Sequence, residues 1–200
     1  NVSFSLGEKD SLGLVGESGC GKSTTAFALM RLLAGNGKIA EGQILLNGTD
    51  LVTASYDEIR KIRWKGISII FQNAMTALNP VMRCDDKVSE MLQQHTVLSA
   101  AQRRKKVLEM FAKVHLPDPQ RIYDAYPHEL SGGQRQRIVI AIALVLRPAL
   151  LICDEPTTAL DVTTQAEILK LIREMQEDTG TAVLFITHDF GVVADIADEV

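Results

Sequence analysis

The feature that most constrains the fold of this chain is a glycine-rich loop near its start, placed directly after a short apolar segment. Residues 12–15 read Leu-Gly-Leu-Val, and residues 16–23 read Gly-Glu-Ser-Gly-Cys-Gly-Lys-Ser, which fits the pattern Gly-x-x-x-x-Gly-Lys-Ser/Thr. Such a loop binds phosphate with backbone N–H groups and with the N-terminus of the helix that follows. The sequence therefore predicts a buried strand, the loop, a helix over residues 23–33, and a nucleoside triphosphate as ligand.

Two side chains of the loop have separate expected tasks. Lys22 is expected to reach the β- and γ-phosphates, and Ser23 is expected to bind Mg²⁺. The alternative is a chance match within an ordinary glycine-rich turn, and the strand before the loop and the helix after it argue against that alternative. The predicted nucleotide-binding residues of the loop are Gly16, Ser18, Gly19, Cys20, Gly21, Lys22, Ser23 and Thr24.

Apolar runs and helical periodicity alternate along the rest of the chain. Further strands are predicted over residues 43–46, 67–71, 150–154 and 182–187, and helices over residues 163–177 and 192–197. Strands that alternate with helices indicate an α/β fold with a mostly parallel sheet. Near the N-terminus, apolar residues at positions 2, 4 and 6 and the Asn47-Gly48 turn predict a smaller antiparallel β part.

The middle of the chain has a different sequence pattern. Residues 88–146 follow a helical pattern without a convincing strand, and Ser99 begins a capping box that opens one of the helices. We interpret residues 81–147 as a helical subdomain inserted into a single domain, whose nucleotide-binding core comprises residues 1–80 and 148–200.

Two acidic residues follow a predicted buried strand. Asp154 and Glu155 come shortly after the apolar residues 149–152, and a buried acid costs free energy unless something pairs with it. A Mg²⁺ ion beside ATP would pair with Asp154, and Glu155 would then be placed to polarise the attacking water as general base. The alternative is an acidic pair that begins a helix on a solvated loop, and the phosphate loop upstream favours the catalytic interpretation.

A second glycine pair precedes a long helical run. Ser131 is a good N-cap, and the free N–H groups after Ser131, at Gly132 and Gly133, form an anion site. A capped helix without further function is the alternative. The segment lies in the helical stretch, away from the phosphate loop of its own chain.

The ordered set of these segments resembles one family, the ATP-binding cassette (ABC) ATPases. Residues 130–134 read Leu-Ser-Gly-Gly-Gln, which matches the LSGGQ signature of that family, and Gln72, Asp161 and His188 stand where the family has its loop glutamine, its loop aspartate and its switch histidine. The resemblance implies a P-loop NTPase core of the RecA-like type, with a helical subdomain that carries the signature. It also implies two subunits that close head to tail around ATP.

The resemblance implies a role for each matching residue. It implies that Lys22, Gln72, Glu155 and His188 act in catalysis. It implies that Gln72, Ser131, Gly132, Gly133, Gln134 and Asp161 contact nucleotide or the opposite subunit. It implies that Ser23, Gln72 and Asp154 hold Mg²⁺.

Finer features resemble one branch of the family. Residues 71–80 are similar to the segment FQDPMTSLNP of oligopeptide, dipeptide and nickel importer ATPases, except that Asn73-Ala74 replaces Asp-Pro, and residues 126–129 and 157–163 resemble the same branch. The resemblance implies an ATP-hydrolysing subunit of an importer for peptides or a related small solute, at the cytoplasmic face of the membrane. The implied partners are a second ABC ATPase subunit, transmembrane permease subunits and, indirectly, a solute-binding protein. It also implies a fragment, because the aromatic residue that stacks on adenine would lie before Asn1.

Two other functions remain to be weighed. A soluble ABC ATPase of DNA repair or translation predicts a coiled-coil insertion or two tandem cassettes, neither of which this chain shows, and the net charge of −4 argues against nucleic-acid binding. A module that binds ATP without turnover predicts the loss of Glu155 or His188, and both are present. No apolar run approaches the roughly 18 residues that span a bilayer.

The three cysteines are far apart and show no metal-ligand spacing, which suggests reduced thiols in a cytosolic setting. Cys84 and Cys153 are interpreted as small packing residues, whereas Cys20 lies within the phosphate loop, where its thiol is expected to be reachable.

Overall fold

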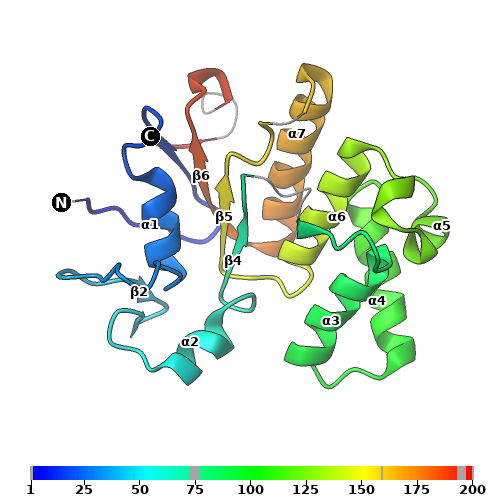
Figure 1. The fold of residues 1–200 in the computed structure, drawn as a ribbon, viewed down its shortest axis with the longest axis horizontal. Helices are drawn as coiled ribbons and strands as arrows, with labels where there is room; N and C mark the ends of the chain where they lie inside the picture. The colour runs from blue at the N-terminus through cyan, green and yellow to red at the C-terminus, as the bar shows by residue number, and fades with distance from the viewer. Residues whose placement is uncertain (1, 73–76, 159, 193–196, 200) are drawn as a thin grey trace.

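The computed structural model describes residues 2–72, 77–158, 160–192 and 197–199 (Figure 1). Its centre is a parallel sheet with the strand order β1-β6-β5-β4. The bounds are Ser11–Val15 for β1, Ile67–Ile70 for β4, Leu150–Asp154 for β5 and Ala182–Thr187 for β6. These four strands confirm the predicted ones, with end shifts of one residue at most.

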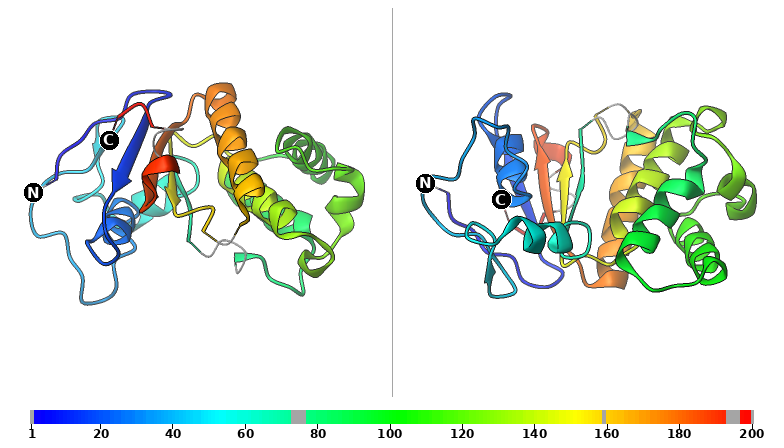
Figure 2. Two further views of the ribbon diagram at one scale, coloured as in Figure 1. Left: turned by 90° about the horizontal axis from the view of Figure 1, so that it is seen from above. Right: turned by 60° about the horizontal axis from the view of Figure 1, so that its bottom comes forward.

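Helices bury both faces of this sheet, so its strands are continuous apolar runs (Figure 2). Successive side chains of a strand point to opposite faces. Ile152 and Leu184 therefore pack in one cluster with α1 (Lys22–Leu29) and α2 (Tyr56–Ile62). Cys153 and Phe185 pack in the other cluster, with α6 (Gly132–Leu144) and α7 (Val162–Thr179).

The chain between β4 and β5 is helical, as predicted, and lies to one side of the sheet (Figure 1). It forms α3 (Cys84–His95), α4 (Ala100–Lys113), α5 (Pro119–Asp124), a short 3₁₀ turn η2 (Pro127–Glu129) and α6. The capping box at Ser99 is confirmed, because its hydroxyl accepts a hydrogen bond from the backbone N–H of Gln102 and its own N–H donates to the Gln102 side chain. The subdomain limits at residues 81 and 147 stay a prediction.

The antiparallel part is smaller than predicted. It consists of β2 (Leu45–Leu46) and β3 (Thr49–Asp50), joined at Asn47-Gly48, where both residues have positive φ (48° and 81°), as a tight hairpin turn requires. Residues 2–6, with their alternating apolar positions, form no strand, because none of the described residues pairs with them as a strand neighbour. The alternation alone was therefore a wrong guide to that segment.

Helix α1 is also shorter than the predicted helix over residues 23–33. It ends at Leu29 because Arg31 has a φ of 51°, and because the Arg63 guanidinium donates to the carbonyl oxygens of Met30 (3.0 Å) and Arg31 (2.6 Å). A tertiary contact thus replaces the hydrogen bonds that another helical turn would make.

The last two predicted helices differ in how far the structure describes them. Helix α7 confirms the helix predicted over residues 163–177, and most of the helix predicted over residues 192–197 lies outside the described residues. No described helix combines the length and apolar character needed to cross a membrane.

Candidate active site

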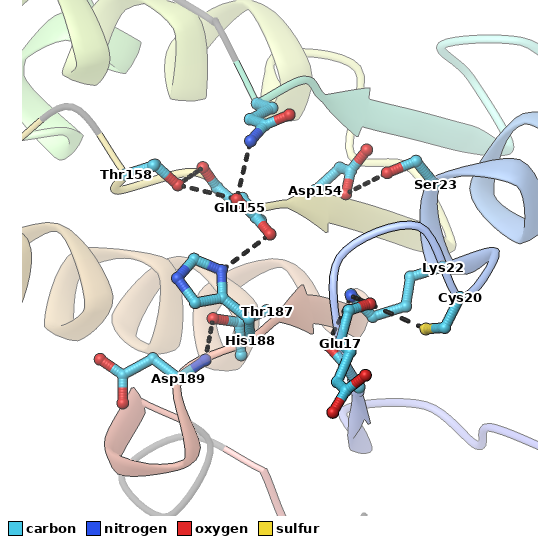
Figure 3. A network of polar contacts seen from close by, with 12 residues as sticks. Glu17, Cys20, Lys22, Ser23, Asp154, Glu155, Thr158, Thr187, His188 and Asp189 are labelled. Carbon is cyan, nitrogen blue, oxygen red and sulfur yellow. Dashed lines mark hydrogen bonds and ion pairs between the residues drawn. The ribbon is translucent and has the colours of Figure 1, made fainter.

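The predicted catalytic and metal-binding residues gather at one edge of the sheet, where its parallel strands end. The phosphate loop follows β1, Gln72 lies two residues after β4, Asp154 ends β5, and His188 follows β6. Carboxyl ends of parallel strands meet at one edge, and this edge is where open α/β sheets bind their ligands. Figure 3 shows the residues of this edge from close by.

The phosphate loop has the backbone that its glycines permit. Gly19 and Gly21 have φ angles of 85° and 105°, and Gly21 is the N-cap of α1. The buried ammonium group of Lys22 donates hydrogen bonds to the carbonyl oxygens of Gly16 (2.6 Å) and Glu17 (2.8 Å). The charge of Lys22 is therefore held by the loop in which the phosphates are predicted to bind.

The three cysteines differ in exposure, as predicted. Cys20 is exposed, and its Sγ lies 3.8 Å from the Nζ atom of Lys22 (Figure 3). Cys84 and Cys153 are buried in the core, which confirms that they are packing residues. Ser18 and Thr24, also predicted to contact nucleotide, are exposed in the loop and in the first turn of α1.

Asp154 and Ser23 lie together at the end of β5. The Ser23 hydroxyl donates a hydrogen bond to Oδ1 of Asp154 at 3.2 Å (Figure 3). Asp154 is 4 % exposed, and burial raises the pKa of its carboxyl against the opposing effect of the Ser23 hydrogen bond. A buried carboxylate beside a hydroxyl is an oxygen donor set of the kind that Mg²⁺ prefers.

This donor set fits an ion that is held mostly by substrate and water. The described residues contain no group of three or more His, Cys, Asp or Glu side chains that could hold a metal ion by themselves. Mg²⁺ in phosphoryl-transfer sites uses one or two protein oxygens together with phosphates and several waters. Gln72, the third predicted Mg²⁺ ligand, makes its described hydrogen bond to Glu155 rather than to Asp154.

Glu155 is the centre of a hydrogen-bonded cluster. Its Oε2 accepts from Nε2 of Gln72 at 2.8 Å and from the Thr158 hydroxyl at 3.2 Å, and its Oε1 lies 2.9 Å from Nδ1 of His188 (Figure 3). The structure thus brings together three predicted catalytic residues that are separated by up to 116 positions (188 − 72) in the chain. Residues 73–76, directly after Gln72, lie outside the described residues.

The surroundings of Glu155 keep its carboxyl ionised. Burial raises the pKa of Glu155, but hydrogen bonds from His188 and Thr158 outweigh burial and lower the pKa overall. Its backbone has a φ of 48°, and its N–H donates to the carbonyl of Ile186 at 2.9 Å. A non-glycine residue rarely adopts such a φ, so neighbouring contacts determine this conformation.

The signature segment lies at the N-terminus of α6, as predicted. The Ser131 hydroxyl accepts from the N–H of Gln134 at 3.3 Å, and the Gln134 side chain accepts from the N–H of Ser131 at 3.0 Å. Gly133 packs closely on α7, because a Cβ atom at Gly133 would lie 3.0 Å from Cγ2 of Thr164. Ser131 and Gly132 complete the first turn, whose N–H groups point out of the helix.

Asp161 caps the neighbouring helix α7. Its carboxylate accepts hydrogen bonds from the backbone N–H (3.0 Å) and hydroxyl (2.7 Å) of Thr164, and these bonds lower its pKa. The first turns of α6 and α7 therefore form a second group of predicted site residues. Among the described residues, no hydrogen bond or ion pair joins Ser131, Gly132, Gly133, Gln134 or Asp161 to the phosphate loop.

Sequence reasoning missed two residues that hold Glu155 or the residue after it. Thr158 bonds to the carboxylate of Glu155, and Gln136 of α6 donates to the carbonyl of Pro156 at 2.7 Å. A hydroxyl three residues after an acid is too common to be a signal. The sequence could have pointed to Gln136, because it lies near the start of an apolar helix. A glutamine that is buried with such a helix needs a hydrogen-bond partner.

Comparisons with known proteins identify the family of this chain. The family model described as ABC transporter matches residues 1–158. The dipeptide transport ATP-binding protein DppD of Bacillus subtilis (strain 168) is 50 % identical over 200 residues, which cover all of this chain and 60 % of that protein. The oligopeptide transport ATP-binding protein OppD of Escherichia coli (strain K12) is 48 % identical, with 100 % and 59 % covered. The chain spans about three fifths of the length of these curated relatives.

Solved structures of similar fold come from the same family. The dimeric structure of MJ0796, a bacterial ABC transporter cassette, matches with a TM-score of 0.82 at 32 % identity, over 97 % of this chain and 81 % of that chain. A dimeric post-hydrolysis state of the ATP-binding cassette MJ0796, bound to ADP and Pi, matches with a TM-score of 0.81. The family model covers most of the chain, and these relatives are 48 % and 50 % identical to it over its whole length, so the chain belongs to the ABC transporter family.

Proposed function

We propose that this chain binds and hydrolyses ATP and that it powers an ABC importer of peptides or a related small solute. The observation that carries the proposal is the cluster in which Gln72, Thr158 and His188 hold the Glu155 carboxylate beside the end of β5. The names of its relatives, which are dipeptide and oligopeptide transport ATP-binding proteins, support the importer and its cargo class. No observation favours the alternative of a soluble ABC ATPase in DNA repair or translation.

Glu155 is suited to act as general base. Its lowered pKa keeps the carboxylate ionised at neutral pH, so that it can accept a hydrogen bond from water and then a proton. His188 and Gln72 orient this carboxylate, and a bound γ-phosphate would offer both side chains a further partner. Catalysis of this kind depends on positioning and on stabilising the charge of the phosphoryl group.

The phosphate loop supplies the charge that holds the triphosphate. Lys22 would exchange the carbonyl oxygens of Gly16 and Glu17 for phosphate oxygens, which are stronger acceptors because they are charged. Ser23 and Asp154 would hold Mg²⁺, and the ion supplies positive charge at the phosphate oxygens when bound. Gln72 would join this set through its Oε1 atom, while its Nε2 atom donates to Glu155.

The signature group implies a second subunit. The first turn of α6 is an anion site that makes no described contact with the phosphate loop of its own chain, so it would serve the ATP of another cassette, head to tail. The dimeric state of the MJ0796 cassettes supports this arrangement. The remaining proposed partners are permease subunits at the cytoplasmic face of the membrane and, through them, a solute-binding protein.

The test is the change Glu155→Gln in the full-length protein. It removes the base but keeps the shape, so ATP hydrolysis is expected to fall at least about 100-fold, while an ATP-bound dimer accumulates in size-exclusion chromatography. Glu109→Gln, the same change at an exposed position of α4, is the matched control and keeps turnover. Full turnover by Glu155→Gln would contradict the proposal.

A further inference from the structure

One buried side chain joins the signature helix to the segment that carries the general base. Gln136 of α6 is 2 % exposed, and its Nε2 donates a hydrogen bond of 2.7 Å to the carbonyl oxygen of Pro156, which is also buried. A buried amide without a partner is costly, so this bond fixes the distance between α6 and the chain after β5.

The carbonyl of Pro156 is a sensitive point for this contact. Proline has no N–H, so its carbonyl is the only backbone group of Pro156 that can form a hydrogen bond. Pro156 directly follows Glu155, whose φ of 48° is an uncommon conformation for glutamate. The N–H of Glu155 is held by Ile186 at 2.9 Å and its carbonyl by the Thr158 hydroxyl at 3.1 Å. Gln136 therefore completes the set of contacts that keeps the Glu155 backbone in place.

The N-terminal end of α6, close to Gln136, carries the signature. Gln136 lies five residues after Ser131 and one helical turn after Gly133, which packs on Thr164 of α7. A helix of 13 residues moves as a unit, so a displacement at its N-terminus reaches Gln136 with little loss. Both functional groups of the chain therefore meet at the hydrogen bond between Gln136 and Pro156.

We propose that Gln136 is a positioning residue that couples the signature end of α6 to the placement of Glu155 in the same chain. The inference rests on the proposed function, in which the signature binds the ATP of the partner cassette. ATP at one site would then order the base at the other site, through α6, Gln136 and Pro156. This coupling makes hydrolysis by the dimer cooperative in ATP.

The test replaces Gln136 by methionine, which has a similar length and no donor. In the full-length protein we expect kcat to fall by up to about 100-fold, because a small displacement of the base can slow catalysis by that factor. We also expect the Hill coefficient for ATP to fall toward 1. The affinity for ATP, measured by equilibrium binding, stays within about twofold, because Gln136 does not touch the phosphate loop. Gln136→Leu serves as a second variant if the methionine variant does not fold.

A matched control separates positioning from stability. Gln176 of α7 is also a buried glutamine whose Nε2 donates to backbone carbonyls, those of Lys9 (2.6 Å) and Asp10 (3.2 Å), far from the signature. Gln176→Met is expected to lower the melting temperature but to keep kcat and the Hill coefficient. If kcat and the Hill coefficient fall equally in Gln136→Met and Gln176→Met, the proposal is overturned. Wild-type kinetics of Gln136→Met would overturn it as well.

The dependence of kcat on pH distinguishes the loss of a hydrogen-bond donor from a change in packing. In Gln136→Glu, a protonated carboxylic acid can donate to Pro156, whereas the ionised form cannot, and burial favours the protonated form. We expect kcat of this variant, relative to wild type, to rise as pH falls; a ratio that stays low at every pH would contradict the role of the donor. If wild type does not hydrolyse ATP, or Glu155→Gln does so fully, the proposed function fails. If both behave as expected but Gln136→Met is unchanged, only the positioning role fails.

Discussion

Alkylation of Cys20 is expected to be selective and to stop ATP hydrolysis. Burial raises the pKa of Cys84 to about 11 and also raises the pKa of Cys153, so both thiols stay protonated at neutral pH. At pH 7.5 a thiol with a pKa of about 11 is ionised in roughly 1 of 3,000 molecules. Since the thiolate is the nucleophile, a maleimide should label the exposed Cys20 at least about 100-fold faster than Cys84 or Cys153.

The adduct would occupy the space in which phosphate is proposed to bind. The Cys20 Sγ atom lies 3.8 Å from Nζ of Lys22 and 2.9 Å from the point where a Cβ atom on Gly16 would stand. A maleimide ring at that sulfur would keep phosphate oxygens from Lys22 and from the loop N–H groups. Each charge-assisted hydrogen bond lost in this way is worth about 1.5–3 kcal/mol, which corresponds to roughly tenfold to a hundredfold in ATP affinity.

The assay combines intact mass spectrometry with ATPase rates on the full-length protein. One adduct per chain and a loss of ATPase activity in proportion to labelling are expected, and saturating ATP should slow both. Cys20→Ser, which keeps a small polar side chain, should abolish the sensitivity to the reagent. Unchanged hydrolysis after complete labelling of Cys20 would refute the idea that its thiol borders the phosphate site.

Two further predictions concern stability. Phe185 in β6 is 1 % exposed, and Phe185→Ala should lower the free energy of unfolding, measured in urea, by about 3–5 kcal/mol. Phe190 is 72 % exposed, so Phe190→Ala should change this free energy little. Burial raises the pKa of Asp85, against a hydrogen bond from Tyr123 that lowers it. A carboxyl with a raised folded pKa stabilises the fold below its unfolded pKa, and this contribution is lost as pH rises through the folded pKa. Asp85→Asn should therefore be more stable than wild type at pH 7, with a gain that shrinks toward about pH 3; a variant less stable at pH 7 would contradict this.

The strand, loop and helix of the phosphate site could be predicted because their chemistry is local. The apolar run before Gly16 and the glycines at positions 19 and 21 restrict the backbone within a few residues of Lys22. The strands β5 and β6 were equally predictable, since a parallel sheet covered on both faces requires unbroken apolar runs.

The errors arose where distant residues decide the local structure. Periodicity could not show that Arg63 takes the carbonyl groups of Met30 and Arg31 and so ends α1 early. Nor could alternation at residues 2–6 show whether a neighbouring strand is available to pair with them. Both failures share one cause, because a local pattern states what a segment can form but not which partner it meets.

The same reasoning explains why the candidate site was only half visible in the sequence. Gln72 and His188 were predicted from the resemblance to the ABC family, and Glu155 from its place after a buried strand. Their hydrogen bonds depend on the strand order β1-β6-β5-β4, which no segment encodes by itself. Gln136 carries a weaker but real signal, because a buried amide must find a partner. That rule fixes the existence of a partner and leaves its identity to the fold. The partner is Pro156, and this contact is the observation on which we propose Gln136 as a positioning residue.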